Sequence, residues 1–195
     1  MLTIVWDVDD VLNDLMYQWF THSWLVAHPA SHCRYTDLSA NPPHEDLGIT
    51  REQYLASLDE FRRTARARDM HPNQEILSWF RSHGSRFRHV ALTARPLESA
   101  PDVASWVLLH FGAWIRTFGV VPTRFAGHEP IYDRNKAEYL RWFRSGDIFV
   151  DDSMENIREA EELGLKTLLY PQPWNDSPLT NEMVLRKLSE WAEVS

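Results

Sequence analysis

The chain has little cysteine and no long apolar run. Cys33 is the single cysteine among 195 residues, so an internal disulfide is excluded and nothing indicates an oxidising compartment. No stretch approaches the roughly 18 consecutive apolar residues that a membrane-spanning helix needs. The first residues enter an apolar strand without the charged and apolar regions of a targeting segment. We therefore expect a cytoplasmic protein with no membrane partner.

Positive charge is also scarce. Lysine and arginine number 20 against 28 aspartates and glutamates, which gives a formal net charge of -8 at pH 7. Such a chain argues against a stable nucleic-acid partner, because that binding depends on neutralising many phosphates. It does not exclude one phosphate monoester, since a bound metal ion can reverse the field locally. The length suits one domain with a sizeable insertion, and we expect a monomer or a homodimer.

The strongest signal lies directly after Met1. Residues 2–6, Leu-Thr-Ile-Val-Trp, predict a buried strand. Three carboxylates follow, Asp7, Asp9 and Asp10, and the first two face the same side in extended geometry. Open α/β folds bind ligands where strands end, and clustered carboxylates need a compensating charge. A hard cation such as Mg²⁺ would supply it, whereas the alternative is an acidic turn without a ligand.

Helices and strands alternate regularly only after residue 70. We expect helices over 13–24, 50–69, 72–84, 101–112, 134–145, 153–164 and 179–192, and strands over 86–92, 120–125, 148–150 and 166–170. Pro122 indicates that the strand over 120–125 lies near an edge. The predicted fold class is α/β, with a doubly wound, mostly parallel five-stranded sheet. Residues 1–12 and 71–195 form its core, and residues 13–70 form a small helical cap inserted after the first strand.

Polar side chains follow three of the predicted strands. They are Asp7, Asp9, Thr93, Asp151 and Asp152. The carboxyl ends of parallel strands lie on one edge of a sheet, so these residues should converge on a single crevice.

These residues carry a resemblance to a known family. The stretch Asp7-Val8-Asp9-Asp10-Val11 matches the first motif of the haloacid dehalogenase superfamily of phosphohydrolases, Asp-x-Asp-x-(Thr or Val). Thr93, Lys136 and the pair Asp151-Asp152 match the second, third and fourth motifs, in that order. The insertion after the first motif resembles the C1-type cap of this family, so the resemblance implies the same core and cap.

Within that family, the chain looks most like the 5'(3')-deoxyribonucleotidase group. This likeness rests on the compact cap, on Asp-Arg-Asn before Lys136, and on residues 170–175, Tyr-Pro-Gln-Pro-Trp-Asn. Asp10 departs from the pattern, because such nucleotidases commonly carry a glycine at this position. The departure bears on the substrate group more than on the reaction.

The resemblance implies a catalytic role for four residues. Asp7 would be the nucleophile that forms an aspartyl-phosphate, and Asp9 would be the general acid and then the general base. Thr93 would donate a hydrogen bond to the phosphoryl group, and Lys136 would stabilise the charge on its oxygens.

The resemblance also implies binding roles. Mg²⁺ would be held by Asp7, the backbone carbonyl of Asp9 and Asp152, with Asp151 bound to the metal directly or supporting it. Ala94 and Arg95 would lie beside the phosphate together with Thr93 and Lys136.

Each of these residues also has an ordinary structural interpretation. Thr93 suits a turn, Lys136 suits a solvated helix face, and Asp151-Asp152 suits the start of a helix. Arg95 is equally a loop arginine or a phosphate contact.

The predicted cap is open to two interpretations throughout. Trp19 and Phe20 are the first candidates for stacking a nucleotide base, but aromatic residues at helical spacing usually build a core. Four arginines on the helix over 50–69 either form a solvated face or clamp the substrate. They are Arg62, Arg63, Arg66 and Arg68.

The sequence thus predicts a Mg²⁺-dependent phosphomonoesterase acting on a small phosphorylated metabolite, with a (deoxy)nucleoside monophosphate as the first candidate. Two alternatives keep the fold: a phosphatase of a sugar phosphate or other small ester, and a non-catalytic regulatory protein. A phosphomutase or a dehalogenase is a further possibility on the same scaffold. A dehalogenase would need neither Asp9 nor the metal carboxylates.

Overall fold

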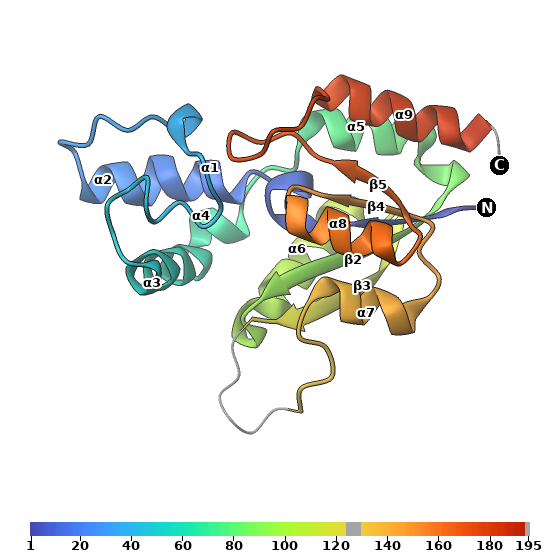
Figure 1. Ribbon diagram of the computed structural model, residues 1–195, viewed down its shortest axis with the longest axis horizontal. Helices are drawn as coiled ribbons and strands as arrows, with labels where there is room; N and C mark the ends of the chain where they lie inside the picture. The colour runs from blue at the N-terminus through green and yellow to red at the C-terminus, as the bar shows by residue number, and fades with distance from the viewer. Residues whose placement is uncertain (124–129, 194–195) are drawn as a thin grey trace.

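The computed structural model describes residues 1–123 and 130–193, and within them it contains a five-stranded sheet flanked by helices (Figure 1). The strands are β1 (Thr3–Trp6), β2 (Arg88–Arg95), β3 (Ile115–Pro122), β4 (Ile148–Asp151) and β5 (Lys166–Leu169). Their order is β3-β2-β1-β4-β5, and all four pairings are parallel. The predicted fold class is therefore confirmed, with a sheet that is parallel throughout these strands.

The register between neighbouring strands determines which polar residues lie side by side at the carboxyl edge of the sheet. Trp6 on β1 lies opposite Ala91 on β2 and Val150 on β4. The backbone N–H of the next residue, Asp7, still donates to the Val150 carbonyl at 2.9 Å. Asp7 and Asp151 therefore leave the sheet side by side at its carboxyl edge. The strand order reverses direction at β1, which is where open α/β sheets form a ligand crevice.

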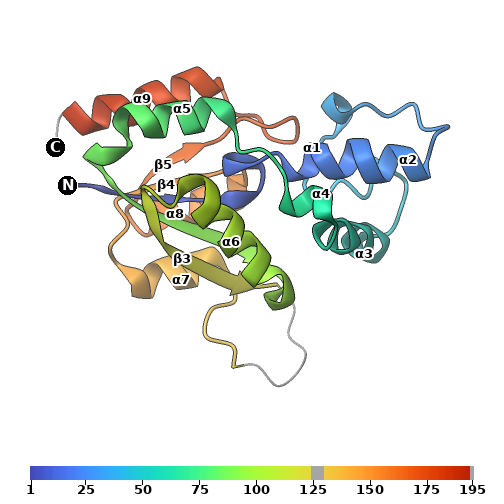
Figure 2. The same cartoon turned by 180° about the vertical axis from the view of Figure 1, so that it is seen from behind.

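The helices of the core are α5 (Gln74–His83), α6 (Ala100–Phe111), α7 (Lys136–Phe143), α8 (Met154–Glu162) and α9 (Asn181–Glu193), with short turns η4 (Gly84–Arg86) and η5 (Leu97–Ser99). Helices α5, α6 and α9 cover one face of the sheet, and α7 and α8 cover the other (Figures 1 and 2). Along β1, Ile4 and Trp6 pack on the first face and Val5 on the second, all fully buried. A strand buried on both faces explains the continuous apolar run, and each such side chain contributes about 1.5–3 kcal/mol.

A separate group of helices lies beside the carboxyl edge of the sheet, away from the N-terminus (Figures 1 and 2). Its elements are α1 (Leu15–Trp19), η2 (Phe20–Trp24), α2 (Leu25–Ala27), η3 (Tyr35–Asp37), α3 (Arg51–Arg62) and α4 (Ala65–Arg68). These elements have a hydrophobic cluster of their own, whose buried members all fall between Leu15 and Met70. We refer to this group of helices as the cap.

Several boundaries differ from those expected from the sequence. The predicted helix over 50–69 is broken in two, because the Thr64 side chain accepts a hydrogen bond from the Ala67 N–H and starts α4. The helix expected from residue 134 begins at Lys136, where the Asn135 side chain caps it, and ends at Phe143, followed by Arg144 with φ at 52°. The third strand begins at Ile115 instead of residue 120 and lies at the edge, as Pro122 predicted. Positions 124 and 125 of the predicted strand lie outside the described residues.

In the part of the chain that the structure describes, no helix is both long enough and apolar enough to cross a membrane.

Candidate functional site

The chain turns sharply where β1 ends. The five residues η1 (Val8–Leu12) form a single wide turn, closed by a hydrogen bond of 3.2 Å from the Asn13 N–H to the Val8 carbonyl. Asp10 sits in this turn with φ at 62°, in the left-handed region that glycine adopts without strain and that aspartate tolerates. The Asp10 carboxylate accepts the Met16 N–H at 2.8 Å and so ties the turn to α1. This geometry explains why either glycine or aspartate can stand at this position.

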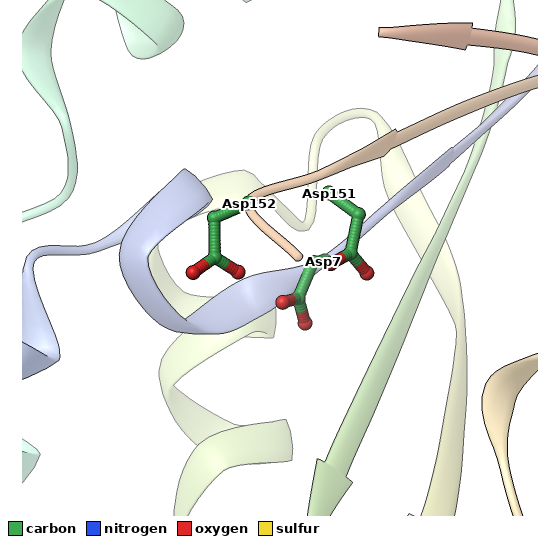
Figure 3. A group of neighbouring side chains, drawn as sticks. All are labelled: Asp7, Asp151 and Asp152. Atoms are coloured by element: carbon green, nitrogen blue, oxygen red, sulfur yellow. The ribbon is translucent and has the colours of Figure 1, made fainter. Parts of the chain in front are cut away.

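Three carboxylates gather at the ends of β1 and β4. Asp7, Asp151 and Asp152 are buried, and each offers one oxygen within 4.8 Å of the others. Figure 3 shows the three side chains at this edge of the sheet, with their carboxylates pointing to the same side.

One cation sits against this cluster. The Lys136 Nζ lies 2.7 Å from Asp7 Oδ1 and 2.7 Å from Asp151 Oδ2, and its side chain is only 3% exposed. Burial alone would lower the pKa of Lys136, but Asp151 and Asp7 outweigh burial and raise that pKa above its usual range. The structure therefore brings Lys136 to the carboxylates that the sequence predicted, as the first residue of α7.

Among the described residues one lysine pairs with the three buried carboxylates, and its charge does not balance theirs. Burial raises the pKa of Asp7 well above its usual range despite Lys136, and Asp151 and Asp152 raise it further. Burial and the neighbouring Asp151 raise the pKa of Asp152 to about 8. The cluster has an excess of negative charge, which a divalent cation would compensate.

The hydrogen bonds show which oxygens remain for such a cation. Both carboxylate oxygens of Asp151 accept hydrogen bonds: Oδ1 accepts from the Ser153 N–H and from Asn156 Nδ2, and Oδ2 accepts from Lys136 Nζ. Asp152 accepts only on Oδ2, from Trp174 Nε1 at 2.8 Å. Among the described residues, Asp7 Oδ2 and Asp152 Oδ1 have no hydrogen-bond donor. The donor set therefore fits a hard cation bound by Asp7 and Asp152, with Asp151 supporting Lys136.

A cavity of about 400 Å³ opens above these residues. From the core it is lined by residues that include Asp7, Thr93, Ala94, Lys136 and Asp152. The Thr93 Oγ1 is buried and has no hydrogen-bond partner among the described residues. A buried hydroxyl without a partner is costly, so this oxygen is suited to a polar ligand in the cavity.

Asp9 has a different environment. The Arg95 guanidinium donates to the Asp9 carboxylate from Nε, at 2.6 Å, and from Nη2. The Arg62 Nη2 lies 3.5 Å from Asp9 Oδ2. Burial raises the pKa of Asp9, but Arg95 and Arg62 outweigh burial and lower it to about 2. Arg95 is therefore neither a free loop arginine nor a residue of the cavity wall, because its side chain is committed to Asp9.

The cap forms the opposite wall of the cavity. Its lining residues there are Leu15, Met16, Asn41, Pro42, Arg51, Tyr54, Leu55, Leu58, Asp59 and Arg62. Trp19 and Phe20 are not among them: they are at most 1% exposed and pack in the cap's hydrophobic cluster. Their placement agrees with the cap-core interpretation, since one face of α1 has to bury its aromatics against α3.

Two functional contacts were not predicted individually. Arg62 points inward, with 11% of its side chain exposed, and pairs with both Asp9 and Asp59. The other three arginines of its group are exposed, as a solvated face requires. Trp174 reaches Asp152 from the segment after β5. In the sequence, Trp174 was noted only as part of residues 170–175, which follow a strand end and contribute to the family resemblance, and neither feature specifies a partner.

Comparisons with known proteins bear on the fold. No family model and no curated protein matches the sequence. A haloacid dehalogenase-like family hydrolase from Streptococcus pneumoniae matches at a TM-score of 0.58 and 15% identity, over 95% of this chain and 90% of that one. A structure assigned as a beta-phosphoglucomutase from Thermotoga maritima matches at 0.56 and 16%, over 97% and 99%. A magnesium-bound haloacid dehalogenase-type hydrolase from Bacillus subtilis matches at 0.50 and 13%, over 98% of each. The chain thus has the fold of haloacid dehalogenase-like hydrolases.

Proposed function

We propose that this protein is a Mg²⁺-dependent phosphomonoester hydrolase that works through an aspartyl-phosphate at Asp7. One observation carries the proposal: a buried carboxylate, a buried lysine, an unpartnered threonine hydroxyl and a free oxygen of Asp152 meet at one cavity. Nucleophile, charge stabiliser and metal ligand are thereby within reach of one phosphoryl group.

Asp7 would attack the phosphorus, and the bond between phosphorus and the ester oxygen would break. The leaving oxygen would take its proton from Asp9. In the second step water would attack the phosphorus, Asp9 would accept the water's proton, and phosphate would leave with Asp7 regenerated. The guanidinium contacts keep Asp9 ionised, the form that suits the second step. For the first step, these contacts have to loosen so that Asp9 can carry a proton.

The remaining residues would act on charge. Lys136 and the Thr93 hydroxyl would contact the phosphoryl oxygens, where negative charge spreads in the transition state. A bound Mg²⁺ would neutralise the excess charge of the cluster and polarise the phosphoryl group. The fit of Asp7 and Asp152 to a hard cation supports this cofactor, as does the magnesium-bound neighbour of the same fold.

The same residues disfavour a dehalogenase and a non-catalytic protein, but they do not separate a phosphatase from a phosphomutase. A dehalogenase has no use for a carboxylate cluster with unshared oxygens, nor for Asp9 as a proton carrier. A phosphomutase uses the same groups, so it differs only in the fate of the phosphoryl group. A non-catalytic protein would have no need for the unpartnered Thr93 hydroxyl in the cavity.

The substrate class depends on the cap wall. We propose a small phosphorylated metabolite, with a (deoxy)nucleoside monophosphate and a sugar phosphate as the two candidates. The nucleotide candidate rests on the resemblance to 5'(3')-deoxyribonucleotidases and on the size of the cavity. Tyr54 is the aromatic residue of the described cavity lining, so it is the candidate among these residues for contact with a base. Its ring otherwise packs in the cap's hydrophobic cluster and is 2% exposed.

The test is a panel of phosphate esters assayed for phosphate release, with Mg²⁺ and after removal of divalent metal by a chelator. The panel should hold nucleoside monophosphates, sugar phosphates, p-nitrophenyl phosphate and a 2-haloacid. We expect metal-dependent phosphate release from at least one ester and no halide release. Halide release, transfer between sugar positions without free phosphate, or inactivity on every ester would each contradict the proposal.

A further inference from the structure

A short segment after β5 links the cap to the catalytic turn. Residues 172–175, which we call the strap, reach from the sheet toward α1 (Figure 1). Gln172 Nε2 donates to the Asp10 carbonyl at 2.5 Å, and Gln172 Oε1 accepts from the Tyr35 hydroxyl of the cap at 3.2 Å. One glutamine therefore contacts both the turn that follows Asp7 and the cap.

Trp174 makes the corresponding link to the metal-binding carboxylate. Its indole Nε1 donates to Asp152 Oδ2 at 2.8 Å, while its ring packs against the cap's hydrophobic cluster. The ring meets Tyr35 edge-on, with centroids 6.1 Å apart and planes at 87°. Asn175 Nδ2 donates to the Asp152 backbone carbonyl at 2.7 Å. Asp152 is thus held by the strap at its side chain and at its backbone.

We propose that Trp174 is a positioning residue that orients the Asp152 carboxylate for Mg²⁺ and couples the metal site to the cap. This inference rests on the proposed function. An indole nitrogen donates but does not accept, so it fixes Oδ2 and does not compete for the metal. Oδ1 is thereby left without a hydrogen-bond donor among the described residues and is available to a metal. Groups that orient a metal ligand in this way commonly change metal affinity about 10- to 100-fold when they are removed.

A purely structural role is the competing explanation. In that case the hydrogen bond would only satisfy the indole N–H, and its loss would lower stability without changing the metal site. Trp79 provides a matched case, because its Nε1 donates to the Ser189 Oγ at 2.9 Å in the core, far along the chain from the carboxylates. Replacing either tryptophan by phenylalanine removes one indole hydrogen bond and keeps most of the ring.

The experiment measures Mg²⁺ binding by titration calorimetry to metal-free wild type, Trp174→Phe and Trp79→Phe. We expect the Kd to rise about 10-fold or more in Trp174→Phe and to stay within about 2-fold in Trp79→Phe. A second measurement needs no variant: in ¹⁵N-labelled wild type, the assigned indole N–H resonance of Trp174 should shift when Mg²⁺ is added, and that of Trp79 should not.

The positioning role would be contradicted if the folded Trp174→Phe variant bound Mg²⁺ with unchanged Kd, or if the Trp174 indole N–H resonance did not shift when Mg²⁺ is added. Neither result would contradict the proposed function. If Trp174→Phe does not fold, the wild-type spectrum decides. Wild type that binds no Mg²⁺ at all would instead contradict the proposed function itself.

A variant in the cap tests the coupling between the cap and the metal site. Tyr35→Phe removes the hydroxyl that donates to Gln172 and leaves the contacts of Asp152 in place. If the cap is coupled to the metal site, we expect the Kd for Mg²⁺ to rise by a smaller factor, about 2- to 5-fold.

Discussion

The cavity has two regions with opposite charge balance. On the core side, Lys136 is the one cation among the described residues that pairs with the cluster of Asp7, Asp151 and Asp152, through Asp7 and Asp151. On the cap-facing side, Asp9 pairs with the guanidinium groups of Arg95 and Arg62, the second of which it shares with Asp59. Both regions are buried, yet the pKa of Asp7 is raised and the pKa of Asp9 is lowered to about 2.

The difference shows how one strand end can supply two kinds of carboxylate. Asp7 and Asp9 are two residues apart, so sequence position alone does not distinguish them. Their partners come from different elements, α7 for Asp7, and β2 and α3 for Asp9. Pairs of acids whose surroundings push their pKa values apart are typical of division of labour in catalysis. In the core region the described carboxylates outnumber the one described cation, Lys136, so this region is suited to a metal, whereas in the cap-facing region the Asp9 charge is already neutralised.

Removing the one cation of the core region should have the largest effect on stability. Lys136→Met leaves buried carboxylates without their ion pair, so the free energy of unfolding of metal-free protein should fall by about 3–5 kcal/mol. Phosphate release should fall about 100- to 1,000-fold. Chemical denaturation and steady-state assays measure the two effects. Lys166→Met, at an exposed lysine, is the control and should cost about 0.5 kcal/mol or less. Equal stability of both variants would mean that the core region does not depend on Lys136.

Adding a cation to the core region should stabilise it. The pKa of Asp152 is raised to about 8, so this residue favours folding at acid pH, and the contribution is lost as the pH rises through about 8. Mg²⁺ at 100 times its Kd should add about 2.7 kcal/mol. The gain should be larger near pH 8.5 than near pH 6, because protons and metal compete for the carboxylates. Melting temperatures with chelator, with Mg²⁺ and with NaCl of matched ionic strength test this. A gain equal to that from NaCl would contradict it.

Removing a cation from the cap-facing region should have a smaller effect with the opposite pH dependence. The lowered pKa of Asp9 stabilises the fold above about pH 4, and this contribution is lost as the pH falls through about 2. Arg95→Met should therefore cost about 2 kcal/mol at neutral pH and progressively less in acid. Urea denaturation at several pH values measures the difference. Arg68→Met, at an exposed cap arginine, should show no such trend, and a pH-independent cost in Arg95→Met would refute the assigned ion pair.

The smallest effect is expected in the interior of the cap. Phe20→Leu keeps an apolar side chain of similar size, so it should cost about 1 kcal/mol of stability. Turnover of a nucleoside monophosphate and of p-nitrophenyl phosphate should change by the same factor, because Phe20 does not reach the cavity. Tyr54→Leu is the matched variant on the cavity wall. A loss confined to the nucleotide in Phe20→Leu would show that this ring stacks a base after all.

The convergence of the core residues could be predicted from the sequence because it follows from topology. An apolar run followed by polar residues marks a strand and its end, and parallel strands bring their ends to one edge whatever the loops do. No further information was needed to predict that Asp7, Thr93 and Asp151 lie at this edge. To predict the location of Lys136, the first residue of its helix also had to be known, and the structure shows that the helix begins at Lys136 itself.

The cap contacts could not be predicted in the same way. Which face of a helix turns inward depends on the surface that it packs against. The break at Thr64 separates Arg62 from Arg66 and Arg68, and Arg63 is already the C-cap residue of the first helix. Trp174 meets Asp152 through two loops that share no periodic pattern. The Arg62 contact arises from packing of the cap on the core, and the Trp174 contact arises from packing between two loops of the core. Neither is encoded by spacing within one element.

The central claim is that the nucleophile is Asp7 and not its neighbour in the cap-facing region. The most direct measurement is an acid quench of the enzyme during turnover with Mg²⁺, followed by borohydride reduction and mass spectrometry of the N-terminal peptide. We predict a reduced acyl-phosphate at position 7, absent when metal is chelated and absent in Asp7→Asn, whose turnover should fall roughly 10⁴-fold or more. Modification at Asp9, or near wild-type turnover in folded Asp7→Asn, would contradict the account.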